Sequence, residues 1–380
     1  MDYREKNNRD RITEYRVFYS MSDFAEDSAK IYFSNTNYNA LMIVDKATWT
    51  VEKTIPFEDE KRAAQNLHLR CVKAAGKVCF LPAEAQHMHV YDIESGKQSV
   101  YRIADPREET AVQGFWDYFA YDGKIYFLPG CAGQKLCMWD VGMNTGRTEN
   151  WWNIPLEDAA VLHGSMDEER FFSFMQGFER LYVTDLSKKT VEEFRLPDEH
   201  IKYVTYDGQD FWYVTTDTAD IVCWNRERGE VDRYPIKGDV WWEKDLIPCI
   251  GIHCAGGHLF LLIYNMTVAY ALCVLDREKR EVKKIYSINC ARGEFAGPEL
   301  EPNFKRAGND LLCLLKNAGE TVRIVPNTWE VKQHIEDFRS GAQERNYTFD
   351  ILLDKGALLY EEPGIADLDM LIRHYAGSED

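Results

Sequence analysis

The chain has 380 residues, 45% of them hydrophobic, and a formal net charge of −18. This length and hydrophobic content suit one large repeat domain or two to three ordinary domains. The acidic excess argues against DNA, RNA or an anionic membrane as the main partner, because those partners need a basic surface. The sequence contains no apolar run of about 18 residues, so we expect no membrane-spanning helix. Residues 1–10 lack an apolar segment, so we expect no secretion signal.

The ten cysteines are scattered along the chain and form no C-x-x-C pair. Several lie inside apolar, strand-like runs, where a free cysteine behaves as a small hydrophobic residue. These are Cys79, Cys137, Cys223, Cys273 and Cys313. We therefore expect reduced core cysteines in a cytoplasmic protein. We expect no cofactor, because the sequence has no phosphate loop, no G-x-G-x-x-G motif and no H-E-x-x-H motif.

Seven hydrophobic runs, each followed by a tight turn, recur along the chain. They are LMIVD (41–45), HVYD (89–92), LCMWD (136–140), LYVTD (181–185), IVCWN (221–225), LCVLD (272–276) and VRIVPN (322–327). Six end in an acidic or amide residue, and Pro326 takes that position in the seventh. An Asp or Asn at a strand end accepts hydrogen bonds from the next turn, so we interpret it as structural. Intervals of 40 to 51 residues predict a repeated supersecondary unit.

One unit can be divided into four strands. The first two are FWDYFAYDG (115–123), which ends in a turn, and KIYFL (124–128). A loop precedes the third, KLCMWDV (135–141), and the fourth is expected at 147–154 after a second turn. Short strands bounded by Gly, Asp and Asn are typical of hairpins. Four antiparallel strands in about 45 residues are typical of a β-propeller blade.

The sequence therefore predicts an all-β fold, a single β-propeller over residues 11–375 with flexible tails at 1–10 and 376–380. The interval averages about 47 residues over the six steps from Asp45 to Pro326, so the chain holds about eight units. We favour eight four-stranded blades, the last closed by an N-terminal strand at 13–20 that joins C-terminal strands within 346–373. Seven blades followed by a terminal helix at 367–375 is the alternative.

Several of the repeated runs resemble the blade signature of WD40-type and YVTN-type propellers. The residues that carry the likeness are Trp139-Asp140, Tyr91-Asp92 and Leu275-Asp276. The likeness covers nearly the whole chain and implies the fold, but no specific subfamily. The Gly-His half of the WD40 signature is missing from every unit.

The longest links join the fourth strand of one unit to the next unit. They cover Phe57–Asn66, Ala104–Gly114, Lys237–Pro248 and Asn289–Pro302. All of them lie on one face of a propeller, and long loops on a rigid scaffold usually carry binding groups. We expect function on that face and in its central funnel.

Aromatic and charged residues on these links and on neighbouring strands suit a sugar or peptide ligand. The predicted binding residues are His68, Trp116, Trp241, Trp242, Arg292 and Glu294. Packing between blades is the alternative role for Trp241 and Trp242. The leading hypothesis is a non-catalytic scaffold that binds a protein, peptide or carbohydrate, with neither nucleic acid nor membrane as partner.

The alternative hypothesis is a propeller enzyme, a lyase, epimerase or hydrolase with a small polar substrate in the funnel. Its catalytic candidates are His163, His253 and Asp117, with histidine moving a proton and Arg292 holding an anionic group. We predict no metal site. The histidines at 68, 163 and 253 come from alternate units, but they sit at different heights along their strands.

Overall fold

The computed structural model describes residues 21–335 with internal gaps, and all structural statements below concern the described residues. The gaps are 37, 49, 62–63, 103–116, 129–134, 153, 155–160, 167–168, 176–178, 200, 216–219, 236–248, 266–268, 290–302, 308–309 and 316–319.

Seven antiparallel sheets, which we call blades 1 to 7, each contain four consecutive strands paired in chain order. Blade 1 contains β1 (Ala25–Glu26), β2 (Lys30–Ser34), β3 (Leu41–Asp45) and β4 (Thr50–Ile55). Blade 2 contains β5 (His68–Ala74), β6 (Lys77–Pro82), β7 (Met88–Asp92) and β8 (Gln98–Tyr101). Blade 3 contains β9 (Asp117–Tyr121), β10 (Lys124–Leu128), β11 (Cys137–Asp140) and β12 (Thr145–Thr148). Blade 4 contains β13 (Val161–Met166), β14 (Arg170–Met175), β15 (Arg180–Asp185) and β16 (Thr190–Arg195).

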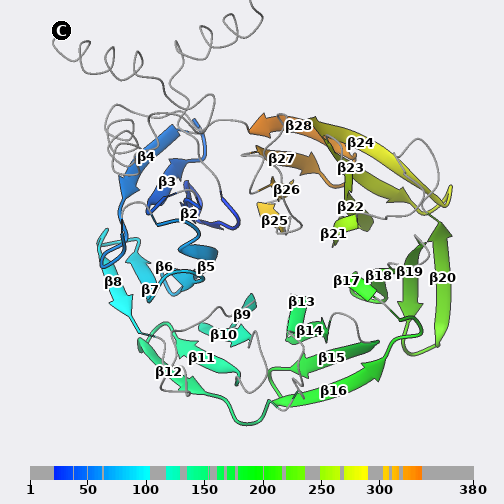
Figure 1. The fold of residues 1–380 in the computed structure, drawn as a ribbon, viewed down its shortest axis with the longest axis horizontal. Coiled ribbons are helices and arrows are strands. Elements are labelled where there is room, and N and C mark those ends of the chain that lie inside the picture. The colour runs from blue at the N-terminus through cyan, green and yellow to red at the C-terminus, as the bar shows by residue number, and fades with distance from the viewer. Residues whose placement is uncertain are drawn as a thin grey trace, which may run out of the picture.

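The remaining blades repeat the pattern. Blade 5 contains β17 (Ile201–Tyr206), β18 (Phe211–Thr215), β19 (Asp220–Asn225) and β20 (Glu230–Pro235). Blade 6 contains β21 (Cys249–Ala255), β22 (His258–Asn265), β23 (Ala269–Asp276) and β24 (Glu281–Asn289). Blade 7 contains β25 (Asn303–Ala307), β26 (Asp310–Leu315), β27 (Glu320–Val325) and β28 (Glu330–Ile335). Figure 1 shows the blades arranged around a central axis, with the first strand of each innermost and the fourth outermost. The predicted propeller of four-stranded antiparallel blades is confirmed.

The core consists of apolar layers between neighbouring blades. Both faces of a blade are buried, so adjacent residues of one strand pack in different layers. In β2, for example, Tyr32 packs toward blade 2, whereas Ile31 and Phe33 lie in a layer that also contains Leu312 of blade 7. This two-sided burial explains why the second and third strands read as continuous apolar runs rather than alternating ones.

The prediction of eight blades is wrong, because blade 7 packs directly against blade 1. Leu312 of β26 lies in the apolar layer formed by Met21, Phe24 and their blade 1 neighbours. The Lys305 ammonium of β25 also lies 2.5 Å from the Asp23 carboxylate. An eighth sheet would have to separate these two blades, so the ring has seven. The expected eight came from dividing the whole chain length by the repeat interval, whereas the seven described blades lie between Ala25 and Ile335. The strands expected at 13–20 and within 346–373 lie outside the described residues.

The repeated Asp or Asn caps the turn between the third and fourth strands, as predicted. Its side-chain oxygen accepts a hydrogen bond from the backbone N–H three residues later. The pairs are Asp45–Thr48 (2.8 Å), Asp92–Ser95 (2.7 Å), Asp140–Met143 (2.9 Å), Asp185–Lys188 (2.8 Å), Asn225–Arg228 (2.9 Å) and Asp276–Lys279 (3.1 Å). Because an amide does the same work at Asn225, the negative charge is not what the turn requires.

Asp185 offers a test of this role. Hydrogen bonds from the Lys188 side chain and from its backbone N–H lower the pKa of the Asp185 carboxyl to about 2. Its contribution is therefore complete above pH 3.8 and is lost as the pH falls toward 2. At pH 7 we expect Asp185→Ala to lower the free energy of unfolding by about 0.5–1.5 kcal/mol, and Asp185→Asn by less than about 0.5 kcal/mol. Urea unfolding measures both; equal losses would contradict the capping account.

The hairpins between the first and second strands use glycine where the turn needs it. Asp122 and Gly123 both have positive φ, 49° and 69°, which matches the twist of a tight two-residue turn. Gly256 has φ of 56°, and a Cβ there would lie 2.7 Å from Asn327 Oδ1 of blade 7. A side chain at 256 would therefore strain the turn and push it off the neighbouring blade.

The fourth strand of blade 3 begins earlier than the sequence suggests. It was expected at 147–154, but β12 spans Thr145–Thr148. The turn closes sooner because Asp140 accepts a hydrogen bond from Met143 N–H and Asn144 adopts a φ of 53°. Trp152, which follows the strand, packs into the layer between blades 3 and 4.

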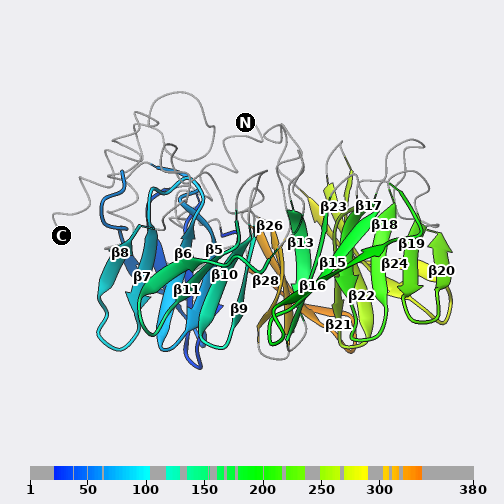
Figure 2. The ribbon, with the colours of Figure 1, turned by 90° about the horizontal axis from the view of Figure 1, so that it is seen from below.

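The two faces of the ring differ in their connections. The turns within the first hairpin and before the fourth strand lie on one face, which we call the short-turn face (lower edge of Figure 2). The described parts of the links from the fourth strand to the next blade lie on the other face, which we call the long-loop face. Nowhere in the described part of the chain is there a helix long and apolar enough to cross a membrane.

Candidate functional site

The link between blades 1 and 2 is the long link that the structure describes most fully. Its first part, Pro56–Lys61, is held by hydrogen bonds at two points, which we call ties. We call this part the 56–61 segment. Asn39, which is 1% exposed, accepts a hydrogen bond from Phe57 N–H through Oδ1 (2.8 Å). Its Nδ2 donates to the carbonyl oxygens of Phe57 and Glu60, each at 3.1 Å. The buried Asn39 amide thus fixes two residues of the segment at once.

A chain of hydrogen bonds through two histidines forms the second tie. His89 Nε2 lies 2.8 Å from the Glu58 carbonyl oxygen, which can only accept, so this nitrogen carries the proton. In a neutral ring His89 Nδ1 is then an acceptor, and His68 Nε2 donates to it at 2.9 Å. His68 Nδ1 in turn accepts from Ser34 Oγ at 3.4 Å. One carbonyl therefore sets the proton positions of both rings.

Both histidine rings are buried, 1% exposed for His68 and none for His89. Phe57 covers them, with ring centroids 4.3 Å from His68 and 5.0 Å from His89. Burial, followed by the charge of His89, lowers the pKa of His68 well below 6.5. Burial also lowers the pKa of His89, against the opposing effect of the Glu58 carbonyl. The pair is neutral at pH 7 as a result.

The outer side of the 56–61 segment is acidic. Glu58 and Asp59 are exposed, whereas Glu60 is half-buried and accepts a hydrogen bond from Gln86 N–H through Oε1 (2.9 Å). Asp59 adopts a φ of 65°, a left-handed conformation that Asp and Asn tolerate better than most residues. The segment is therefore a fixed backbone that presents carboxylates to solvent.

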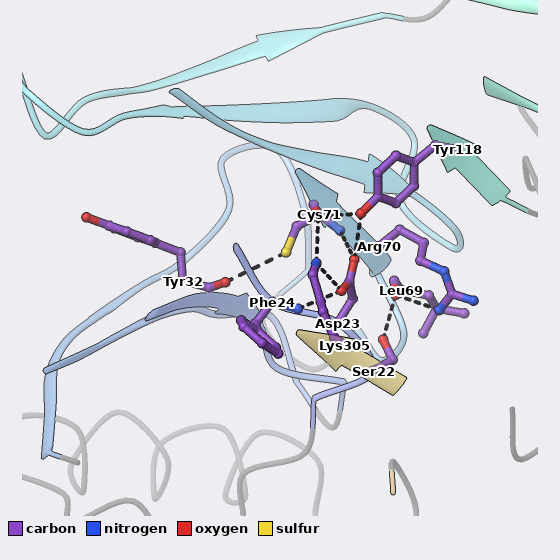
Figure 3. Close-up of polar contacts among 9 residues, drawn as sticks. All are labelled: Ser22, Asp23, Phe24, Tyr32, Leu69, Arg70, Cys71, Tyr118 and Lys305. Carbon is purple, nitrogen blue, oxygen red and sulfur yellow. Dashed lines mark hydrogen bonds and ion pairs between the residues drawn. The ribbon is translucent and has the colours of Figure 1, made fainter. Parts of the chain in front are cut away.

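A second polar cluster joins the innermost strands of four blades (Figure 3). We call it the Asp23 cluster: Asp23 next to β1, Cys71 of β5, Tyr118 of β9 and Lys305 of β25. Asp23 Oδ1 accepts from Phe24 N–H at 2.9 Å and from Lys305 Nζ at 2.5 Å. Asp23 Oδ2 accepts from Cys71 N–H at 2.8 Å, and the Tyr118 hydroxyl lies 2.9 Å from it. The Asp23 side chain is 3% exposed and that of Lys305 is 28% exposed, so the cluster is an ion pair with a buried carboxylate and further donors to it.

The Tyr118 hydroxyl has one proton between two acceptors, because the Cys71 carbonyl oxygen lies 2.6 Å from it. Burial and the Asp23 charge raise the pKa of Tyr118 well above 10, and burial raises that of the Cys71 thiol. Both groups are therefore protonated at neutral pH and serve as donors. Elsewhere burial raises the thiol pKa of Cys79, Cys223 and Cys254 to about 12. Of the cysteines predicted in the core, Cys223 is half-buried and the other four are buried: Cys79, Cys137, Cys273 and Cys313.

Most residues predicted from sequence for the site lie outside the described residues: Trp116, Trp241, Trp242, Arg292 and Glu294. Asp117 begins β9 and His163 lies within β13, but neither side chain is among those described. Their roles, and their distance from His253, stay predictions.

Two of the predicted residues are placed. His253 of β21 is half-buried, and its ring stacks on Phe304 of blade 7 at 5.8 Å and 15°. His68 is buried at the start of β5 and belongs to the tie on the 56–61 segment. Within the described ranges, no three histidine, cysteine or carboxylate side chains are grouped so as to hold a metal ion.

The sequence analysis did not single out Asn39, His89, Asp23 or Lys305. His89 looked like one more residue of a core strand. The signal that was available is the His-Met-His run at 87–89, because a histidine in a buried strand needs a polar partner. Asp23 and Lys305 are far apart in the chain and carry no local signal.

Comparison with known proteins identifies the fold and goes no further. No family model and no curated protein matches the chain. The crystal structure of the RRP9 WD40 repeats is similar with a TM-score of 0.52 at 9% identity, covering 78% of this chain and 88% of that one. The structure of KlHsv2 with loop 6CD replaced by a Gly-Ser linker is similar with a TM-score of 0.52 at 11% identity, and the match covers 83% of this chain and 98% of that one. The structure of hydrazine synthase from Kuenenia stuttgartiensis is similar with a TM-score of 0.55 at 12% identity, and the match covers 80% of this chain and 95% of that one. The resemblance to WD40-type propellers is thus shown for the fold, without a subfamily.

Proposed function

We propose that this chain is a non-catalytic β-propeller scaffold that binds a protein, peptide or carbohydrate partner on its long-loop face. The observation that carries the proposal is the double tie on the 56–61 segment. Asn39 and His89 hold its backbone at Phe57, Glu58 and Glu60. A segment fixed before binding loses little conformational entropy when a partner docks, which favours recognition.

The exposed charge on this segment indicates what a partner would bring. Glu58 and Asp59 project from a chain whose formal net charge is −18, so a docking group with amines, guanidinium groups or hydroxyls is complementary. Charge of one sign raises the encounter rate and orients the partner more than it raises affinity. The partner's contact with the segment is accordingly expected to weaken with salt.

A photo-crosslinker tests which face binds. We expect benzoylphenylalanine at position 58 to label a partner in lysate. The same group at Lys188, which is 75% exposed on the short-turn face, should not label it. With that partner purified, we expect Glu58→Gln with Asp59→Asn to weaken binding about two- to tenfold, as loss of exposed ion pairs does. Asn suits the left-handed backbone at 59, so the variant removes charge without straining the segment.

The matched control removes two exposed carboxylates from the outermost strand of blade 4, through Glu192→Gln with Glu193→Gln. This control should leave binding unchanged. Equal labelling from positions 58 and 188, or equal affinity of the two double variants, would remove the long-loop face from the proposal. Turnover of a small polar substrate by the purified protein, abolished by His253→Ala, would favour the propeller enzyme instead.

A further inference from the structure

The hydrogen bonds of the His68–His89 pair are all satisfied when both rings are neutral. Each ring then has one protonated and one accepting nitrogen, and the two facing nitrogens, His68 Nε2 and His89 Nδ1, are 2.9 Å apart. Protonating His89 Nδ1 would set two N–H groups against each other. A proton on His68 Nδ1 can be donated to Ser34 Oγ, because a hydroxyl also accepts, but it places a positive charge on a ring that is 1% exposed. The chain of hydrogen bonds that holds Glu58 is therefore most stable while both rings are neutral.

We infer that the His68–His89 pair is a pH-sensitive clasp, which holds the 56–61 segment on blades 1 and 2 at neutral pH and releases it on acidification. The Asn39 tie has no titratable group, so it does not respond to pH in this range. The segment therefore has one constant anchor and one switchable anchor. When Glu58 is released, the segment no longer holds its carboxylates in the fixed arrangement that the proposed partner site requires. This consequence rests on the proposed function.

The groups around the pair set how readily it takes up a proton. From the 56–61 segment itself, the charges of Glu60 and Asp59 favour a protonated His89. From the strand that carries His89, His87 opposes it. A hydrogen bond with the His87 backbone favours a protonated His68. Ser34, Phe57 and, from β6, Phe80, whose centroid lies 6.0 Å from that of His68, are uncharged neighbours. The charges of the acidic segment therefore favour the protonated state of His89, and burial opposes it.

The sign of the pH effect follows from the same surroundings. In the clasped state both rings have a pKa below 6.5, chiefly because they are buried. In the released state the rings are hydrated and titrate near 6.5, so that state binds more protons as the pH falls below this value. Acid accordingly favours release, and the clasp is complete above pH 6.5. The ratio of released to clasped protein rises about tenfold per pH unit for each proton taken up.

Amide hydrogen exchange on the full chain without any partner tests the clasp. The reporter is the peptide spanning 56–61, which contains the Glu58 backbone that His89 holds. Each rate is divided by the intrinsic rate of the same amide at the same pH, from pH 7.5 to 5.0. We expect the ratio to rise about tenfold for each unit below 6.5 in the wild-type protein.

Two variants assign the effect to the pair. His68→Gln with His89→Gln keeps polar side chains but cannot titrate, so we expect its ratio to be independent of pH. His258→Gln removes a histidine from blade 6, where it packs edge-on against Trp329, and should keep the wild-type slope. Hydrogen exchange at the histidine C2 position of the wild-type protein gives the two ring pKa values. This measurement does not depend on whether the double variant folds. We expect both below 6.5.

A flat profile in the wild-type protein, or a slope that persists in the double glutamine variant, would overturn the clasp. So would ring pKa values at or above 6.5. Because no partner is present, these outcomes leave the proposed binding function to the crosslinking experiment. Conversely, a failed crosslink leaves the clasp standing as a property of the free protein.

Discussion

Asp23→Ala is expected to lower the free energy of unfolding by about 3–5 kcal/mol, as loss of one partner from a buried ion pair does. The substitution leaves the buried Cys71 N–H without its acceptor and takes the carboxylate from the Tyr118 hydroxyl and the Lys305 ammonium, which keep the Cys71 carbonyl oxygen as an acceptor. These groups come from blades 2, 3 and 7, so the loss falls on several blades at once. Urea unfolding followed by far-UV circular dichroism and by tryptophan fluorescence measures the change.

The exposed ion pair Lys30–Glu52 is the matched control for Asp23. Its N–O distance is also 2.5 Å, but its side chains are 36% and 35% exposed. We expect Glu52→Gln to change the free energy of unfolding by less than about 1 kcal/mol. Lys305→Met should cost less than Asp23→Ala, because Asp23 then keeps three donors. If Asp23→Ala and Glu52→Gln cost the same, the Asp23 cluster does not join the blades in the way described.

Trp212→Ala is expected to cost about 3–5 kcal/mol. Trp212 is 1% exposed in the apolar layer between blades 5 and 6, so its removal leaves a large cavity there. Its indole N–H donates to Asp207 Oδ2 at 2.7 Å, and the Arg277 guanidinium of blade 6 stacks over its ring at 4.2 Å. Arg277 also pairs with the same Asp207 oxygen at 3.1 Å. Thermal or urea unfolding provides the measurement.

Met143→Ala is the control for Trp212, because Met143 is a large apolar side chain that is 76% exposed in a short-turn-face turn. Its removal opens no cavity and should change the free energy of unfolding by no more than about 0.5 kcal/mol. Trp212→Phe should recover part of the loss, since the ring fills most of the space but cannot donate to Asp207. A loss for Trp212→Ala similar to that for Met143→Ala would contradict the packing between blades 5 and 6.

The repeat was predictable from sequence because each blade needs the same short apolar strands and tight turns. The run at 41–45 became β3 with its predicted bounds, and the turn predicted at the end of 115–123 has positive φ at Asp122 and Gly123. The number of blades was not predictable in this way. It depends on which blade meets blade 1, and the contact that decides it joins Asp23 to Lys305 across almost the whole chain.

For the proposed site, the sequence indicated a face of the ring but not the contacts on it. The long links indicated the face, and Phe57–Asn66 is the link that the structure describes there. The ties at Asn39 and His89 depend on where backbone carbonyls lie in space, which no residue pattern records. His68 shows the same limit: the sequence gives a histidine at the start of a strand, and only packing against Phe57 decides that it is buried.

A double-mutant cycle on Asp23 and Lys305 tests most directly whether the ring closes by contact between blades 1 and 7. The free energies of unfolding of the wild type, Asp23→Ala, Lys305→Met and the double variant give the coupling between the two residues. Direct contact predicts a coupling of about 0.5–3 kcal/mol. A coupling of zero within error would contradict the seven-bladed ring, because an eighth sheet between these blades would hold the two side chains apart.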